Sequence, residues 1–187
     1  MLHIQLALAC LLVTVAPAED IWVDPVLGDN ANPGTEAEPL RTIFAASNQH
    51  DGIIRLMPGE YSAATGERFP IRLEGQDSIV AEGDSSNTRI VIRDGGSLPN
   101  SDGVQVAADC LIKGVTIVQE GTVSTALKQA PAPFTINNSL RLEDSRILGG
   151  LHGILGAGNG AMILMDCEIA GQARAAIEIY RGSLTMT

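Results

Sequence analysis

The sequence predicts an all-β fold, a right-handed parallel β-helix in which coils of about 22 residues stack along one axis. Three observations predict this fold. The C-terminal half aligns with itself when it is slid by 22 residues, which places segment 139–147 over segment 161–169. Within each repeat, apolar residues alternate as they do in a strand, and glycines recur where tight corners are expected. Only 3% of the residues are aromatic, which suits a core of stacked aliphatic side chains.

Residues 1–18 read as a secretory signal peptide. They form an uncharged apolar run that ends in Ala-Pro-Ala, the small-residue pattern of a cleavage site after Ala18. The run is shorter than the roughly 20 apolar residues that span a bilayer, so we expect cleavage and no membrane span afterwards. The mature protein is therefore expected to be secreted, periplasmic or at the cell surface.

The mature chain, residues 19–187, is predicted to form a single β-helix domain. Its size leaves little room for a second core. With 22 acidic against 12 basic residues, the net charge of −10 excludes nucleic acid as a partner, because binding phosphates needs clustered cations. Residues 19–60 are expected to form the N-terminal strand and a cap helix, and residues 61–187 the coils.

The N-terminal elements follow from local patterns. Apolar runs predict strands at residues 21–23, 53–57, 71–73 and 90–92. Residues 40–50 are amphipathic, with Leu40, Ile43 and Phe44 on one side, and predict a short helix. Since the end of a β-helix exposes unpaired strand edges, this helix is expected to cap them.

The repeat also predicts which residues stack on one another. The expected inward columns are Cys110, Leu140, Met162 and Leu184; Ile112, Leu142, Leu164 and Met186; and Ile117, Ile147 and Ile169. Two upstream columns are expected to hold Val104, Phe134, Leu155 and Ile177, and Val106, Ile136, Ala157 and Ile179, with one residue of slippage at the third coil. Cys110 and Cys167 fall in different columns two coils apart, beyond the roughly 7 Å limit for a disulfide, so both thiols are expected to be free.

Two segments break the regular repeat. Residues 118–133 lengthen one corner, and are expected to form either a binding lip or a disordered excursion. The chain ends at Thr187, within a coil. This ending predicts either a piece of a longer β-helix or an end-to-end contact at the C-terminal coil.

Residues 21–83 resemble a known family. The matching motifs are Trp-Val-Asp-Pro at 22–25, Gly-Asp-Asn-Ala-Asn-Pro-Gly-Thr at 28–35, Pro-Leu-Arg-Thr-Ile at 39–43, Met-Pro-Gly-Glu-Tyr at 57–61 and Thr-Gly-Glu-Arg-Phe-Pro-Ile at 65–71. They resemble the N-terminal domain of unknown function found in secreted bacterial pectate-lyase-like β-helix proteins. The resemblance implies fold and export more than a reaction, because the same cap also precedes polysaccharide lyases.

The outward positions supply the candidate chemistry. The repeat places Lys113 beside Glu143, Asp144 beside Asp166, and Arg146 beside Glu168, each pair about 4.8 Å apart along the stack. Stacked carboxylates repel unless a cation bridges them, so Asp144 and Asp166 with Glu143 or Glu168 are the candidate calcium ligands. Lys113 or Arg146 is then the candidate base. The alternative is that aspartates at corners are ordinary turn residues and that the ion pairs are structural.

A second candidate calcium site lies in the loop before the expected helix. Asp29, Asn30 and Asn32 offer oxygen ligands on a glycine-containing loop. The alternative, which we favour, is that these side chains bond to their own backbone and shape the turn into the helix.

Three functions fit these observations. We favour an exported, non-catalytic module at the cell envelope that presents one flank to a polysaccharide or an envelope protein and requires no cofactor. The second is a calcium-dependent uronate lyase, or a fragment of one, acting by β-elimination. The third is a structural stalk segment.

Overall fold

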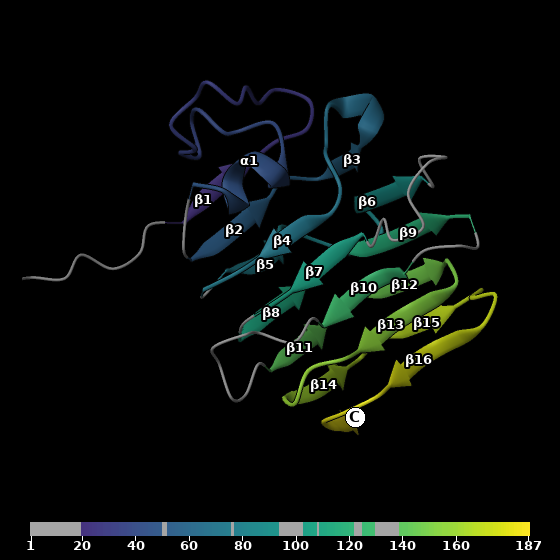
Figure 1. Ribbon diagram of the computed structural model, residues 1–187. Coiled ribbons are helices and arrows are strands. Elements are labelled where there is room, and N and C mark those ends of the chain that lie inside the picture. Colours follow the sequence, from purple (N-terminus) through teal and green to yellow (C-terminus); the bar gives the residue numbers. More distant parts are fainter. Residues whose placement is uncertain are drawn as a thin grey trace, which may run out of the picture.

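Strands dominate the computed structural model. It describes residues 20–49, 52–75, 77–93, 103–107, 109–121, 125–129 and 139–187, so the expected signal peptide, residues 1–18, lies outside the described residues. The strands form three sheets, and the coils stack in sequence order from the purple N-terminal end to the yellow C-terminal end (Figure 1). This mostly β architecture is consistent with a parallel β-helix.

Each sheet takes one strand from successive coils. The first sheet holds β1 (Ile21–Val23), β2 (Ile53–Leu56), β5 (Ser78–Ala81), β8 (Cys110–Lys113), β11 (Leu140–Glu143), β14 (Ala161–Met165) and β17 (Ser183–Met186). The second sheet holds β3 (Gly59–Ser62), β6 (Thr88–Arg93), β9 (Thr116–Glu120), β12 (Arg146–Gly149) and β15 (Glu168–Ala170). The third holds β4 (Ile71–Leu73), β7 (Val104–Val106), β10 (Thr125–Gln129), β13 (His152–Gly156) and β16 (Ala175–Ile179).

The register of the first two sheets confirms the expected columns. Leu140 lies between Cys110 and Met162, and Leu184 follows Met162. The columns that start at Ile112 and Ile117 are likewise confirmed, the latter through Ile147 and Ile169. Parallel pairing at this register stacks like residues over like, which gives each coil the same inward face as its neighbour.

The register of the third sheet differs from the expected one. Ile177 pairs with Ile154 rather than Leu155, and Ile179 pairs with Gly156 rather than Ala157, so these two expected pairings are wrong by one residue. The interior position of β13 falls on Ile154, which is fully buried and pairs with Leu127, whereas Leu155 is only half-buried. The sequence offered two neighbouring aliphatic residues, and the second of them was wrongly placed inside.

Residues 118–133 were expected to form one long corner, and this prediction is wrong. β9 continues to Glu120, and β10 spans Thr125–Gln129 within the segment. Leu127 of β10 pairs with Val104, the partner that had been expected at Phe134. The sequence pattern misled because β10 holds one large aliphatic residue among Thr, Ala, Lys and Gln. Phe134 and Ile136 lie outside the described residues.

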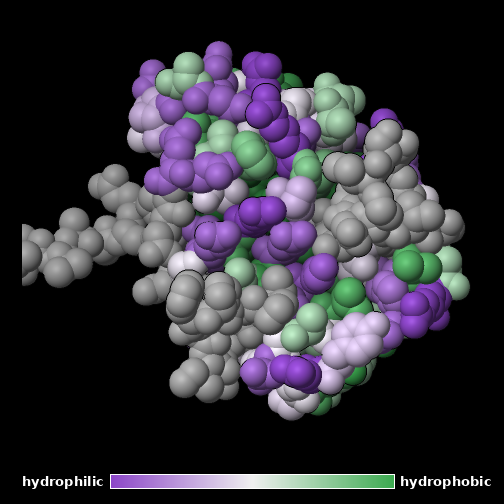
Figure 2. Space-filling view, viewed as in Figure 1, coloured by the Kyte–Doolittle hydropathy of each residue, from purple (hydrophilic) through white to green (hydrophobic). Residues whose placement is uncertain are grey.

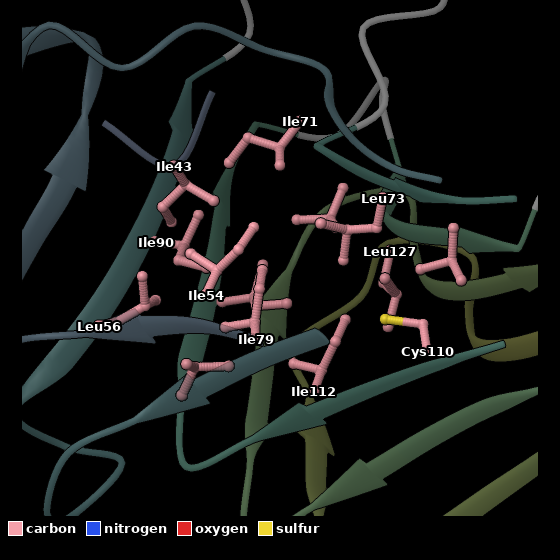
Figure 3. Packing of buried hydrophobic residues seen from close by; sticks show 14 of the residues in the cluster. Ile43, Ile54, Leu56, Ile71, Leu73, Ile79, Ile90, Cys110, Ile112 and Leu127 are labelled. Carbon is pink, nitrogen blue, oxygen red and sulfur yellow. The ribbon is translucent and has the colours of Figure 1, made fainter. Parts of the chain in front are cut away.

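The core is a tube of aliphatic side chains, and Figure 3 shows isoleucines and leucines from all three sheets meeting inside it. Tyr61 is the large exception. It is fully buried, and its hydroxyl donates to the carbonyl oxygens of Val23 and Met57, each at 2.8 Å. A buried phenol needs such partners, because an unbonded hydroxyl in this environment is destabilising.

The two cysteines in the described residues confirm the prediction of free thiols. Cys110 is buried in the first sheet, and Cys167 is half-buried at a corner. Burial raises the pKa of the Cys110 thiol, so it stays protonated and behaves as a small apolar core residue.

A short helix, α1 (Ile43–Ser47), lies near the N-terminal end of the stack (Figure 1) and is shorter than the expected helix at residues 40–50. Thr42 is its N-cap, with Oγ1 accepting from the Ala45 amide at 3.1 Å. The Glu67 carboxylate accepts from the amides of Ile43, at 2.8 Å, and Phe44, at 2.9 Å. None of the helices in the described residues is long and apolar enough to cross a membrane.

Replacing Leu142 by Ala tests the stacked core. Leu142 is fully buried between Ile112 and Leu164, so we expect the free energy of unfolding in urea to fall by about 2–5 kcal/mol. The matched control is Leu148→Ala, at a half-buried position on β12, which should lose less than half as much. Equal losses would contradict the interior placement of Leu142.

Replacing Glu67 by Gln tests the buried carboxylate. Burial raises the pKa of Glu67 above its ordinary 4.5, because desolvation outweighs three backbone hydrogen bonds. A folded-state pKa above the unfolded value gives stability at low pH that is lost as the pH rises through the folded value. Urea unfolding at several pH values should therefore show the wild type losing stability relative to Glu67→Gln as the pH rises above about 4.5. A difference that stays constant or grows in favour of the wild type would contradict this.

Candidate functional site

The corner between the first and second sheets is built on a left-handed backbone position. Gly114 has φ 72°, Asp144 φ 48° and Asp166 φ 51°, and these three residues follow β8, β11 and β14. Glycine adopts this conformation without strain, and aspartate is among the few other residues that tolerate it. The aspartates are therefore turn residues first, and the turn fixes where their carboxylates lie.

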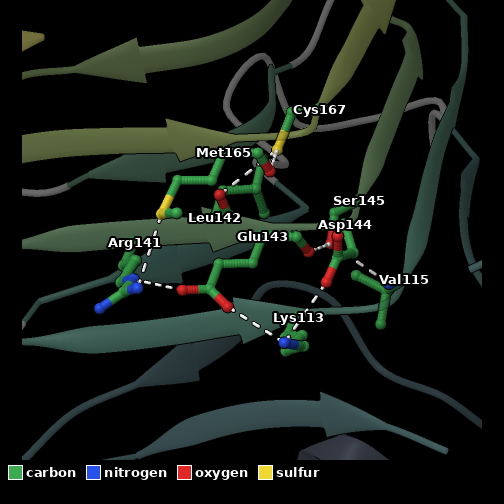
Figure 4. A network of polar contacts seen from close by, with 9 residues as sticks. All are labelled: Lys113, Val115, Arg141, Leu142, Glu143, Asp144, Ser145, Met165 and Cys167. Atoms are coloured by element: carbon green, nitrogen blue, oxygen red, sulfur yellow. Dashed lines mark hydrogen bonds and ion pairs between the residues drawn. The ribbon is translucent and has the colours of Figure 1, made fainter. Parts of the chain in front are cut away.

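The residue after each left-handed position points inward and bonds the backbone of the corner. Ser145 is buried, accepts from the Val115 amide at 3.2 Å and donates to the Glu143 carbonyl at 2.6 Å. Cys167, one coil on, donates from Sγ to the carbonyl oxygens of Met165 at 3.1 Å and Leu142 at 3.3 Å (Figure 4). These contacts hold the successive corners against one another.

Lys113 lies at the centre of an ion-pair network on the outside of the first sheet. Its Nζ lies 3.2 Å from Glu143 Oε2 and 3.3 Å from Asp144 Oδ2. Arg141 pairs with the other carboxylate oxygen of Glu143, as Figure 4 shows. The predicted neighbours Lys113 and Glu143 are thus brought together, and both negative charges beside Lys113 are matched by a cation.

The second predicted pair also forms. Arg146 Nε lies 2.8 Å from Glu168 Oε2, one coil away on the outside of the second sheet. Within the described residues, Asp166 has no ion-pair partner, and its side chain is exposed. The structure therefore leaves one of the predicted carboxylates open to solvent at the corner.

Asp144 and Arg146 on one coil and Asp166 and Glu168 on the next line an open depression of about 630 Å³. Ser85 and Thr187 also contribute to its polar lining. On the face seen in Figure 2, hydrophilic residues surround small hydrophobic areas, so polar surface of this kind is common among the coloured residues. The depression differs from that surface because its polar groups repeat along the stacking axis.

The donor set at this corner does not fit calcium as it stands. Calcium takes six to eight oxygen ligands, and carboxylates are its main charged ligands. Glu143, Asp144 and Glu168 are each paired with Lys or Arg, which would have to be displaced. Among the described residues, no group of three or more His, Cys, Asp or Glu side chains is arranged to hold a metal ion.

Lys113 is also poorly suited to act as a base. Its hydrogen bond to Glu143, followed by that to Asp144, raises the pKa of the Lys113 ammonium above its ordinary value. A general base must be unprotonated at the working pH, and these contacts favour the protonated form. The geometry instead makes Lys113 a fixed cation that positions two carboxylates.

The three polar residues at 29–32 shape the loop before α1. Asn30 Oδ1 accepts from the amides of Arg41, at 3.0 Å, and Thr42, at 3.1 Å. Asn32 Nδ2 donates to the Pro39 carbonyl at 2.9 Å, and Asp29 Oδ1 accepts from the Ala31 amide at 3.0 Å. These hydrogen bonds to the backbone are the ones expected if the three side chains shape the turn into the helix. A calcium ion at this loop stays a prediction.

The cluster around His152 was not predicted from the sequence. The His152 side chain is only 7% exposed, and its Nε2 lies 2.8 Å from Glu178 Oε2. Its Nδ1 lies 3.4 Å from Thr125 Oγ1, so three successive coils meet at one imidazole. The signal was hidden because Thr125 is recognised as a partner only when β10 is placed correctly.

Comparison with known proteins identifies the family. The profile described as "Protein of unknown function (DUF1565)" matches residues 26–160. The chain belongs to the DUF1565 family. No curated protein matches the DUF1565 chain.

One solved protein resembles the DUF1565 chain in structure. It is the GH136 lacto-N-biosidase from Eubacterium ramulus, matched both as the native protein and as its selenomethionine derivative. The sequence identity is 18%, the TM-score 0.42, and the match covers 89% of this chain and 30% of the lacto-N-biosidase. The DUF1565 chain thus spans about a third of the length of that enzyme.

Paired substitutions at Asp144 test the left-handed corner. Asp144→Ala and Asp144→Gly both remove the ion pair with Lys113, so the difference between them reports on the backbone alone. Because alanine is strained at positive φ, we expect Asp144→Ala to be less stable than Asp144→Gly by about 1 kcal/mol in urea unfolding. The same pair of substitutions at Glu143, which precedes the corner, should show the reverse order.

Proposed function

We propose that this DUF1565 chain is an exported, non-catalytic β-helix module at the cell envelope, and that its corner depression binds a neutral polysaccharide. The observation that supports this most is the repetition of polar groups along the depression, where Asp144 and Arg146 are followed one coil on by Asp166 and Glu168. A polysaccharide repeats its hydroxyl groups along its length, so a ladder of charged hydrogen-bonding groups can bind several residues of one chain.

The charge of the depression favours a neutral ligand. Asp144, Asp166 and Glu168 contribute three carboxylates, and Arg146 is the one cation among the lining residues. A polyuronate would bring further negative charge against this surface in a chain of net charge −10. Hydroxyl groups, in contrast, donate readily to exposed carboxylates.

A calcium-dependent uronate lyase is the second candidate. It is favoured by the exposed carboxylate of Asp166, which has no ion-pair partner among the described residues and lies one coil from Asp144 in the same depression. The ion pairs of Lys113 and Arg146 count against it, because each candidate base is engaged with an acidic neighbour. Binding without reaction is therefore the better-supported proposal.

Export and capping complete the proposal. Residues 1–18 carry the features of a cleaved signal peptide, which would deliver the mature chain to the envelope. Helix α1 would cover the N-terminal strand edges, supported by its position at that end of the stack (Figure 1). The coil is proposed to be right-handed, as nearly all parallel crossover connections are.

Calorimetric titration of the mature protein with neutral oligosaccharides, such as cellulose, xylan and mannan fragments, tests the binding proposal. Asp166→Gly removes the open carboxylate at a position where glycine is unstrained, and should weaken binding by about tenfold or more. The matched control, Glu36→Gln, changes an exposed acidic residue outside the depression and should leave the affinity unchanged. Unchanged affinity in Asp166→Gly, or no binding by any of these fragments, would refute the proposal.

A parallel assay separates the lyase alternative. The mature protein is incubated with polygalacturonate and calcium while the absorbance of unsaturated products is followed. We expect no product. Product that forms in the wild type and disappears in Lys113→Ala would replace the non-catalytic proposal with the lyase.

A further inference from the structure

Two adjoining hollows lie beside helix α1, away from the corner depression. One, of about 250 Å³, is lined by Phe44, Asn48, Phe69 and Arg72 among others. The other, of about 360 Å³, is lined by Phe44, Asn48 and Arg68 among others. Phe44 and Asn48 line both, and the two neighbouring hollows are named together the cap hollow.

Aromatic rings are concentrated at the cap hollow. The whole chain has three phenylalanines, and Phe44 and Phe69 both line this site. Both rings are only partly buried, and Phe69 also packs against the hydrophobic core. A partly exposed ring offers an apolar surface to the C–H face of a sugar or to another flat apolar group.

The cap hollow also contains two arginines without an acidic partner among the described residues, Arg72 in one hollow and Arg68 in the other. Within the described part of the chain, seven basic residues are paired with acids: Arg55, Arg89, Arg93, Lys113, Arg141, Arg146 and Arg174. Arg68 and Arg72 form no ion pair with any described residue, and both are exposed. In a chain of net charge −10, an arginine without an acidic partner among the described residues leaves positive charge at each hollow, which can attract an external anion.

The backbone around the cap hollow is held in place before any ligand arrives. The Arg68 guanidinium lies 5.8 Å from the centre of the Phe44 ring, a cation–π distance that fixes this cation at the rim. The nearby acid, Glu67, is buried and bonds the amides of Ile43, Phe44 and Arg68. Glu67 therefore serves the start of α1, and it turns its charge away from solvent.

We infer that the cap hollow binds an anionic saccharide residue, a pyranose that carries a carboxylate or a sulfate. The Phe44 and Phe69 rings would contact the apolar face of the pyranose, and Arg72, which lines the same hollow, would bind its anionic group through charge-assisted hydrogen bonds. Arg68 would add positive charge from the second hollow. The Asn48 side-chain amide, which lines both halves of the site, would bond ring hydroxyls. This inference does not depend on the corner depression, whose charge is opposite in sign.

Calorimetric titration with three oligosaccharides of matched length tests the inference: one with glucuronate residues, one with sulfated residues and one neutral. The wild type should bind at least one of the anionic probes about tenfold or more tightly than the neutral probe in 50 mM salt, with weaker binding as salt rises. The carboxylate and sulfate arms show which anionic group is preferred.

Three variants decide where the anionic probe binds. Arg72→Gln should weaken it about tenfold or more, and Phe44→Leu should weaken it while thermal unfolding shows that the fold persists. The matched control is Arg93→Gln, which changes an exposed arginine on β6 that is paired with Glu120 of β9. It should leave the affinity unchanged. Equal weakening in Arg93→Gln, unchanged affinity in Arg72→Gln, or no preference for the anionic probes would each overturn the inference.

One further comparison separates this inference from the function proposed above. Asp166→Gly should leave binding of the anionic probe unchanged, and Arg72→Gln should leave binding of neutral fragments unchanged. Loss of anionic binding in Asp166→Gly would place that ligand at the corner depression and contradict the cap hollow as its site.

Discussion

The structure depends on hydrogen bonding between parallel strands of successive coils. Because each strand pairs in register with its counterpart one coil away, every corner, inward face and outward face recurs at about 4.8 Å intervals. The position of a residue within one coil therefore decides which residues of the neighbouring coils it contacts. A leucine at an inward position becomes part of a column, as Leu142 does between Ile112 and Leu164, and a polar residue at a corner becomes part of a ladder.

This repetition explains why the corner is both strained and polar. A corner between two sheets needs a left-handed residue on every coil, and only glycine and a few short polar residues fit there. Gly114 meets the requirement without a side chain, whereas Asp144 and Asp166 meet it and add a carboxylate. Backbone geometry thus selects the acidic residues of the depression, and the neighbouring cations then neutralise part of their charge.

The sequence predicted the parts of the fold where the repeat is unbroken. The columns through Leu142 and Ile147 were predictable because the 22-residue repeat, lengthened to 30 residues between Ile112 and Leu142, aligns them and their large aliphatic residues alternate cleanly. The third sheet was not, since Ile154 and Leu155 are both large aliphatic residues and the sequence does not show which of the two faces the interior. The ion pairs at the corner followed from the same repeat. The cap hollow could not be predicted, because Phe44, Phe69 and Arg72 come from a helix, a loop and a strand that share no repeat.

The charge distribution links the two proposed sites. The corner depression carries an excess of carboxylates, whereas the cap hollow carries the unpaired guanidinium groups of Arg68 and Arg72. Opposite charges on one small domain favour different ligands at each site, since the carboxylates of the corner depression repel the anionic ligand that the cap hollow attracts. A domain of this kind would be able to hold a neutral polysaccharide along its coils and an acidic one at its N-terminal end. Such a division of charge is more informative than the net charge of −10, which by itself would argue against any acidic ligand.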